Sequence, residues 1–196
     1  MENNNSANMA RVAISRIMME PAVLPYMQEM AEKLPRTFAH SVDVAYLAGE
    51  VGYECELDYT DDIIRGGLLH DIGKLRVPHD LLTASRKLTP DERDILRNHA
   101  MLGYEMIAGS GIFSDIVKDV VKSHHERQDG SGYPEGKTGA LLKKATKIIT
   151  VCDMYDALTE QRPYRKAFRA YEALNIITDS PVDRSILKIL KECPDR

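Results

Sequence analysis

The sequence predicts an all-α fold. Apolar residues recur at the three- and four-residue spacing that marks one face of a helix. Helix-start signals precede two segments, and the one β-branched run has no evident partner strand. At 196 residues and 43% apolar composition, the chain can form one substantial core and is too short for two large domains.

Two short helices are expected before residue 36, interrupted by Pro21 and Pro25. Their apolar positions need a partner, which is either the rest of this domain or a second copy of the chain. These positions are Ile14, Ile17, Met18, Leu24, Met27, Met30 and Leu34. We therefore interpret residues 1–35 as a helical linker or extension that allows a homodimer, and residues 36–196 as one domain.

The next helices are expected around residues 40–51, from Thr60 and from Thr89. One face of the first combines His40, Val44, Leu47 and Val51. Thr60 precedes two aspartates, which favour a helix amino terminus. At Thr89 a capping-box spacing coincides with a proline at the first helical position, so a helix start is predicted there.

Three further segments complete the expected architecture. The spacing over residues 95–106 places one face of a helix at Ile95, His99, Leu102 and Met106. Residues 127–139 hold four glycines and one proline, and a loop is predicted. The β-branched run 148–151 continues into residues 152–158 with helical spacing, so helix is preferred to strand.

Charge and cysteine content exclude several classes of protein. A formal net charge of −4 argues against binding to nucleic-acid polymers or anionic membranes. The three cysteines are scattered without a Cys-x-x-Cys pair, which indicates neither a disulfide framework nor a thiolate zinc site. No signal peptide or membrane-spanning run is evident, and a cytoplasmic protein is predicted.

Five of the six histidines fall within or at the ends of expected helices whose same-face neighbours are apolar: His40, His70, His99, His124 and His125. A single buried histidine is more often satisfied by a carbonyl group than by a metal. Five together, joined by two carboxylates that are costly to bury unpaired, favour metal coordination. Those carboxylates are Asp71 and Asp153.

The spacing of these residues indicates two metal ions. Adjacent residues on a helix diverge by about 100°, so His124 and His125 are expected to serve two neighbouring ions rather than one. Asp71 is positioned to bridge the ions with its two oxygens. A hydroxide generated between the ions would attack phosphorus in line, which predicts a metal-dependent phosphohydrolase.

Three ordered motifs resemble the HD-GYP domain, a bacterial subgroup of the HD phosphohydrolases. They are His70-Asp71-Ile72-Gly73-Lys74, the run from His124 to Pro134, and Asp153-x-x-Asp156-Ala157-Leu158 followed by Arg162-Pro163-Tyr164-Arg165. The resemblance covers about residues 36–190. It implies an HD-domain helical bundle with a dinuclear metal centre that hydrolyses cyclic di-GMP to pGpG and/or GMP, using iron or manganese.

The resemblance also implies residue roles. The metal-ligand positions are His40, His70, Asp71, His99, His124, His125 and Asp153. Asp71 and Lys74 are the catalytic positions, and Lys74 also contacts the scissile phosphate. Tyr133 borders the substrate, while Arg162 and Arg165 hold the dinucleotide through guanidinium–phosphate pairs.

Two other positions are interpreted beside this set. Asp129 is expected to orient a ligand histidine rather than to bind metal itself. Arg36 stands where relatives proposed to hold three metals carry a glutamate, and because arginine cannot ligate metal, two ions are predicted.

Other functions remain open from sequence alone. A two-metal centre does not choose the base, so the substrate is alternatively a mixed cyclic dinucleotide or an alarmone. A different class is a non-catalytic nucleotide sensor, or an adaptor for a GGDEF diguanylate cyclase. The complete ligand set favours the enzyme.

Overall fold

A computed structural model describes residues 5–161 and 166–193, and every regular element within them is helical. The elements are α1 (Asn5–Met18), α2 (Leu24–Lys33), α3 (Pro35–Glu54), α4 (Thr60–Leu69), the 3-10 helix η1 (Ile72–Arg76), α5 (His79–Leu82), α6 (Pro90–Arg97), α7 (His99–Ala108), α8 (Asp115–Ser123), α9 (Lys144–Thr159), α10 (Ala170–Thr178) and α11 (Arg184–Glu192). The predicted all-α fold is confirmed.

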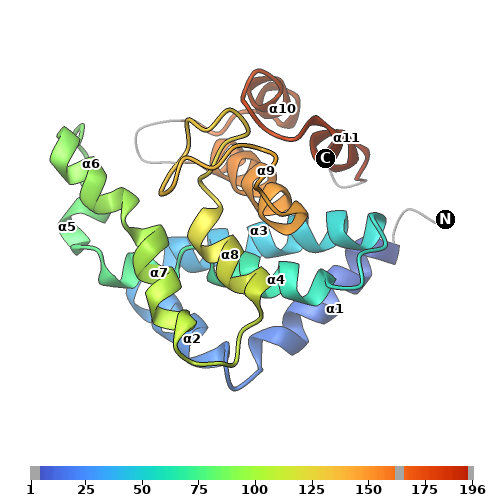
Figure 1. Ribbon diagram of the computed structural model, residues 1–196, viewed down its shortest axis with the longest axis horizontal. Helices are drawn as coiled ribbons and strands as arrows, with labels where there is room; N and C mark the ends of the chain where they lie inside the picture. Colours follow the sequence, from blue (N-terminus) through green and yellow to red (C-terminus); the bar gives the residue numbers. More distant parts are fainter. Residues whose placement is uncertain (1–4, 162–165, 194–196) are drawn as a thin grey trace.

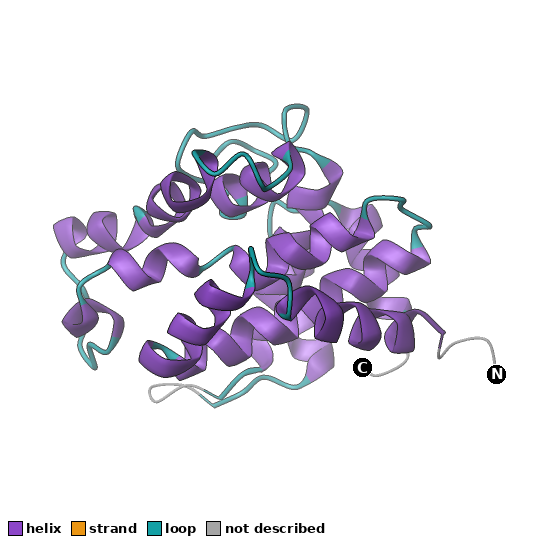
Figure 2. Ribbon diagram, turned by 90° about the horizontal axis from the view of Figure 1, so that it is seen from below, coloured by secondary structure: helices purple, strands orange, loops and turns teal. Residues whose placement is uncertain are grey.

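Helix α3 is the centre of the bundle. It contacts α1, α2, α4, α9 and α11, and Figure 1 shows it running through the middle of the molecule. The view turned by 90° in Figure 2 shows helices joined by loops throughout the described residues. One apolar cluster joins α3 to α9, α10 and α11, and a second lies among α1, α2, α4 and α8. The predicted face of α3 is buried, since Val44 and Val51 are fully enclosed and His40 and Leu47 nearly so.

Helices α1 and α2 lie against the body of the same chain. Ile17, Met27 and Met30 are buried in the cluster shared with α4 and α8. The apolar positions of these helices therefore find a partner within the chain. Pro25 does not interrupt a helix, because it occupies the first turn of α2, where its missing N–H group costs nothing.

The helix starts follow local chemistry closely at Thr89. Its hydroxyl accepts from the Glu92 backbone N–H, and the Glu92 carboxylate accepts from the Thr89 N–H, which confirms the predicted capping box. Helix α4 begins at Thr60, as expected. The Thr60 hydroxyl donates to the Leu57 carbonyl at 2.6 Å instead of capping the helix.

The predicted continuous face over residues 95–106 is wrong. The chain turns between α6 and α7 at Asn98, so Ile95 is 47% exposed and the buried side of α7 starts at His99. Gly103 and Ile107 follow on that side. A break in the helix resets its phase, which the apolar spacing alone does not reveal.

The segment between α8 and α9 is an irregular loop, and the run 148–151 lies inside α9, so both predictions are confirmed. A buried carboxylate holds this loop through hydrogen bonds to its backbone. The fully buried Glu126 carboxylate accepts backbone N–H groups from Glu135 at 2.7 Å and Lys137 at 3.0 Å. One isolated antiparallel bridge, Asp129 to Thr138, closes it.

Two features position the site. Gly67 lets α4 approach α3 closely, because a Cβ atom there would lie 2.7 Å from the Cα of Ala45. Residues 79–97, which we call the α5–α6 arm, stand out from the bundle in Figure 1, and no residue of α6 is buried. Among the helices of residues 5–161 and 166–193, none is long and apolar enough to cross a membrane.

Candidate metal centre

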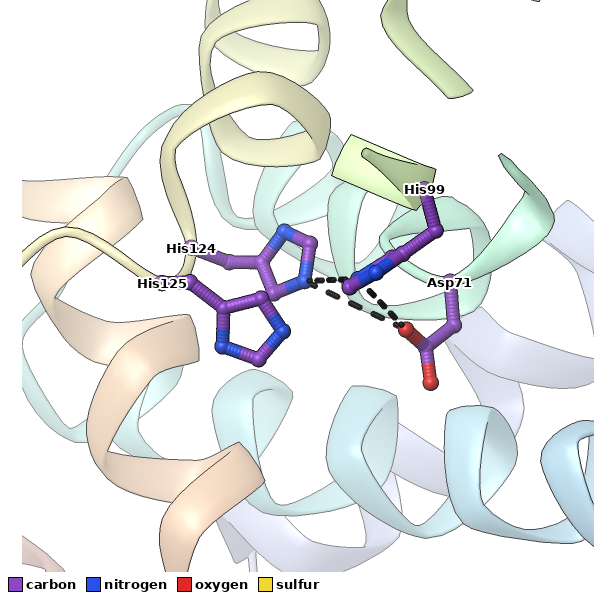
Figure 3. A group of neighbouring side chains, drawn as sticks. All are labelled: Asp71, His99, His124 and His125. Carbon is purple, nitrogen blue, oxygen red and sulfur yellow. Dashed lines mark hydrogen bonds and ion pairs between the residues drawn. The ribbon is translucent and has the colours of Figure 1, made fainter. Parts of the chain in front are cut away.

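Five elements bring the expected ligand residues into one buried region. Helix α3 supplies His40, the end of α4 supplies His70 and Asp71, and α7 supplies His99 at its first residue. His124 and His125 follow the end of α8, and Asp153 lies on α9. Figure 3 shows Asp71, His99, His124 and His125 converging on a common point.

The side chains form two groups with metal-binding potential. In each group one ligand atom per residue lies within 4.8 Å of all the others. The first group is Asp71, His99, His124 and His125, and the second is His40, His70 and Asp71. Asp71 belongs to both groups, and its role as a bridge between two ions stays a prediction.

Backbone carbonyls fix the protonation of three imidazoles. The Nδ1 atoms of His70, His99 and His124 lie 2.7, 2.7 and 3.0 Å from the carbonyl oxygens three residues earlier. A carbonyl oxygen only accepts, so each Nδ1 carries the proton and donates. Each Nε2 atom is left as a lone-pair acceptor in the neutral ring.

These lone pairs face one another without a donor between them. His99 Nε2 lies 3.3 Å from His124 Nε2, and His70 Nε2 and Asp71 Oδ1 are buried without a hydrogen-bond partner among the described residues. Facing acceptors and orphaned buried polar atoms are costly in a protein interior. Imidazole nitrogens and carboxylate oxygens are donors for divalent transition metals, so the residues present fit such ions.

Burial lowers the pKa values of three of these imidazoles. Burial lowers the pKa of His70 and, with the neighbouring His125, lowers that of His124 well below the ordinary value. Burial also lowers the pKa of His125 to about 3, although Asp153 opposes the shift. These rings are therefore neutral at pH 7, which is the form that binds metal.

The two carboxylates stay ionised. Burial disfavours the charge on Asp71, but Lys74 and His70 outweigh it and hold its pKa well below the ordinary range. Burial likewise opposes the charge on Asp153, and its hydrogen bond to His40 prevails and lowers the pKa. Both side chains are thus anionic acceptors at neutral pH.

His40 is held between acidic groups. Its Nε2 lies 3.1 Å from Asp153 Oδ1 and its Nδ1 lies 2.5 Å from Asp156 Oδ2. Burial opposes the charge on this ring, yet the hydrogen bonds to Asp153 and Asp156 raise its pKa to about 10. Asp156 belongs to the third sequence motif and lies three residues after Asp153, on the same face of α9.

Asp153 lies beside both groups without belonging to either. It is 3.1 Å from His40 Nε2, and its other oxygen is 3.9 Å from His125 Nδ1. His124 and His125 were expected to diverge by about 100°, as adjacent residues of a helix do. Their rings do not diverge by a helical step, because α8 ends at Ser123, and the ring centroids of His124 and His125 are 4.1 Å apart.

A pocket of about 720 Å³ opens on one side of the centre. His40 and Lys74 line it on the side of the centre, and Lys74 donates from Nζ to Asp71 Oδ2 at 2.5 Å. Arg36 and Glu160 also line it and form an ion pair at 3.1 Å. The pocket therefore places a lysine between solvent and the shared carboxylate.

Tyr133 packs against the centre at His125. Its ring stacks on His125, with centroids 4.7 Å apart, and the guanidinium of Arg97 lies 5.4 Å from the Tyr133 centroid. Burial raises the pKa of the Tyr133 hydroxyl. Tyr133 is absent from the described lining of the pocket, so its contact with substrate stays a prediction.

Three other predicted residues have different outcomes. Asp129 accepts from the backbone and hydroxyl of Ser131 and contacts no histidine. The prediction that it orients a ligand is wrong, because a local turn uses its carboxylate. Arg162 and Arg165 lie outside the described residues, so their roles stay predictions.

Comparisons with known proteins give consistent matches. A family model described as HD domain matches residues 25–184. A cyclic di-GMP phosphodiesterase of Pseudomonas aeruginosa is 39% identical over 142 residues, which cover 70% of this chain and 34% of the relative. The 3'3'-cGAMP-specific phosphodiesterase 1 of Vibrio cholerae is 36% identical over 148 residues, covering 72% and 33% respectively. The chain thus spans about a third of the length of these relatives.

A solved structure has a similar fold. The HD domain of the L. monocytogenes phosphodiesterase PgpH, in complex with cyclic-di-AMP, matches with a TM-score of 0.63 at 20% sequence identity. The match covers 86% of this chain and 94% of that chain. At this identity the likeness concerns the fold alone.

Proposed function

The chain belongs to the HD domain family, and from that membership we propose that it is a metal-dependent phosphodiesterase that hydrolyses cyclic di-GMP to pGpG and/or GMP. The observation that carries the proposal is the set of buried imidazole nitrogens that face one another around Asp71. Relatives named as cyclic dinucleotide phosphodiesterases support the choice of substrate class.

The proposed cofactors are two divalent transition-metal ions, iron or manganese. Two groups of ligand atoms sharing one carboxylate support a pair of ions rather than one. The residues that would hold them are His40, His70, Asp71, His99, His124, His125 and Asp153. When bound, such ions supply Lewis-acid polarisation of phosphate oxygens and lower the pKa of water.

The chain's own residues contribute positioning and charge. The ammonium group of Lys74 lines the pocket, so it can donate to a non-bridging oxygen of the phosphate being cut and stabilise charge that develops there. Its bond to Asp71 fixes where that donor stands. The carbonyl-fixed imidazoles keep the centre rigid, which lowers the cost of ordering it around a substrate.

A neighbouring substrate is the second candidate. One relative is named for specificity toward 3'3'-cGAMP, and one solved neighbour is a complex with cyclic-di-AMP. A pair of metal ions acts on the phosphodiester and not on the base, so a mixed cyclic dinucleotide or an alarmone remains a competing substrate.

Further partners follow as proposals. The loop between α8 and α9 carries the Gly-Tyr-Pro residues and offers a surface for a GGDEF diguanylate cyclase. A homodimer through α1 and α2 would use their outward side, where Val12 of α1 is 62% exposed and Met19, in the turn after α1, is 67% exposed. A cytoplasmic location stays the prediction drawn from the scattered cysteines.

The direct test is product analysis. Protein loaded anaerobically with iron or manganese is incubated separately with cyclic di-GMP, 3'3'-cGAMP, cyclic-di-AMP and an alarmone, and the products are separated by chromatography. We expect pGpG or GMP from cyclic di-GMP at the highest rate. Absence of product from every nucleotide under both metals would contradict the proposal.

The Asp71→Ala variant separates an enzyme from a sensor. In an enzyme, loss of the shared carboxylate abolishes turnover. A protein that binds cyclic di-GMP tightly, never cleaves it and is unaffected by Asp71→Ala would instead be a sensor or adaptor.

A further inference from the structure

The α5–α6 arm supplies much of the lining of the pocket beside the metal centre. His40 and Lys74 line the 720 Å³ pocket together with arm residues from Leu81 to Leu88 and Leu96. This volume is in the range of sites that enclose drug-sized ligands, roughly 300–1,000 Å³. A ligand much larger than one phosphate group therefore fits between the centre and the arm.

The described lining of the pocket holds more basic than acidic side chains. Four of its side chains are lysine or arginine, and the only carboxylate among the described residues that line it is Glu160. The lysines and arginines are Arg36, Lys74, Arg86 and Lys87. Such a lining favours an anionic ligand.

Three of the four cations already have carboxylate partners. Arg36 pairs with Glu160, Lys74 with Asp71, and Arg86 with both oxygens of Glu92 at 2.5 and 2.7 Å. Lys87 differs. Its ammonium group makes no ion pair or hydrogen bond with any residue in 5–161 or 166–193.

The backbone around Lys87 is braced on both sides. Arg86 Nη1 donates to the Lys87 carbonyl at 3.4 Å while it holds Glu92. The same Glu92 accepts the backbone N–H of Thr89 at 2.9 Å. One carboxylate thus ties both ends of the turn that carries Lys87, so the backbone at Lys87 is set before a ligand arrives.

We infer that Lys87 binds the second phosphate of a cyclic dinucleotide, the one that is not being cut. This inference rests on the proposed function. A cyclic dinucleotide carries two phosphodiesters on opposite sides of one ring, so placing one at Lys74 and the centre directs the other away from them. Lys87 is the lysine of the pocket lining for which no ion pair is found among residues 5–161 and 166–193, and Leu81, Leu82 and Leu88 of the same lining offer apolar surface for a base.

The inference assigns Lys87 to recognition and not to chemistry. A substrate with two phosphates gains an interaction that a single phosphodiester cannot make. Lys87 should therefore affect KM for the dinucleotide, with kcat close to that of the wild type, because the contact is the same in the ground state and the transition state.

The test compares Lys87→Ala with wild-type protein on two substrates, cyclic di-GMP and bis(p-nitrophenyl) phosphate, which has one phosphodiester. We expect KM for cyclic di-GMP to rise about tenfold with kcat nearly unchanged, the size of one charge-assisted contact. The ratio of kcat/KM for cyclic di-GMP to that for the small ester falls by a similar factor. Lys87→Arg, which keeps the positive charge, should have a KM close to that of the wild type.

Lys188→Ala is the matched control, because Lys188 is 78% exposed on α11 and does not line the pocket. Lys188→Ala should leave KM and kcat unchanged for both substrates. Calorimetric titration of metal-free protein with cyclic di-GMP gives a second readout, with about tenfold weaker binding expected for Lys87→Ala.

The outcomes separate this inference from the proposed function. Turnover of cyclic di-GMP with equal KM and equal Kd in Lys87→Ala overturns the role of Lys87 and leaves the phosphodiesterase intact. Absence of turnover by wild-type protein, with binding that still weakens in Lys87→Ala, overturns the proposed chemistry and retains the phosphate contact. Absence of both turnover by metal-loaded wild-type protein and binding by metal-free wild-type protein overturns both.

Discussion

At the scale of single residues, three backbone carbonyls decide how the histidines present themselves. Gly67, Leu96 and Val121 each accept from an Nδ1 atom three residues later and turn the Nε2 lone pair toward Asp71. The candidate ligands could be proposed from residue type and motif order. Their protonation could not, because it depends on where each helix ends and which carbonyl is thereby exposed to the ring.

Asp156 should position His40 for metal binding. Its carboxylate lies 2.5 Å from His40 Nδ1, which holds the ring with Nε2 toward the centre. We expect Asp156→Ala to weaken manganese binding about tenfold, the usual size of such an outer carboxylate effect, measured by chelator competition. The manganese affinity of Asp156→Asn, which keeps an acceptor oxygen, should lie between those of the wild type and Asp156→Ala.

Asp115→Ala is the matched control, since Asp115 is a 90% exposed aspartate on α8. If Asp156→Ala bound manganese as tightly as the control, Asp156 would have no positioning role.

Tyr133 should act through its ring and not through its hydroxyl. The ring stacks on His125 beneath Arg97, while the hydroxyl makes no hydrogen bond with the described residues. Tyr133→Phe should therefore retain wild-type stability and metal content. Tyr133→Ala should lose about 1–3 kcal/mol of unfolding free energy, because it deletes a partly buried aromatic contact.

Urea denaturation of metal-free protein measures this difference, and elemental analysis reports the metal content. A loss in Tyr133→Phe as large as that in Tyr133→Ala would show that the hydroxyl carries the contribution.

At the scale of elements, local signals and packing share control of the helices. The capping box at Thr89 fixed a helix start that could be predicted from four residues. The end of α6 at Arg97 and the end of α8 at Ser123 could not be predicted. Both ends place histidines at the centre, so they are set by the tertiary arrangement of the site and not by propensity.

The close approach of α3 and α4 has its own test. A Cβ atom at Gly67 would lie 2.7 Å from the Ala45 Cα atom, and backbone atoms cannot rotate aside. Gly67→Ala should lower the free energy of unfolding by about 1–3 kcal/mol through overpacking. Separation of α4 from α3 should also weaken metal binding, because it moves His70 away from His40.

Gly109→Ala is the control, because nothing lies within 4 Å of a Cβ atom at Gly109 and its φ is −79°. Its stability should stay within about 0.5 kcal/mol of the wild type in urea denaturation. Equal stability of the two variants would mean that the helices tolerate a wider separation.

At the scale of the whole molecule, the fold brings ligands from five separate elements to one buried point. The all-α class and the identity of the seven candidate ligands followed from apolar spacing and motif order. The way α1 and α2 cover the body did not, because an apolar helix face fits either its own domain or a second chain. The contribution of the α5–α6 arm to the pocket lining could not be predicted either, since the position of the arm depends on contacts distant in sequence.

The central claim is that the buried imidazoles and carboxylates hold metal ions, and elemental analysis of anaerobically purified protein tests it most directly. After removal of loosely bound metal, wild-type protein should retain about two transition-metal ions per chain, because Asp71 joins two groups of ligand atoms. Asp71→Ala should retain fewer than one. Wild-type protein that retains no transition metal, or an Asp71→Ala variant that retains as much as the wild type, would contradict the account.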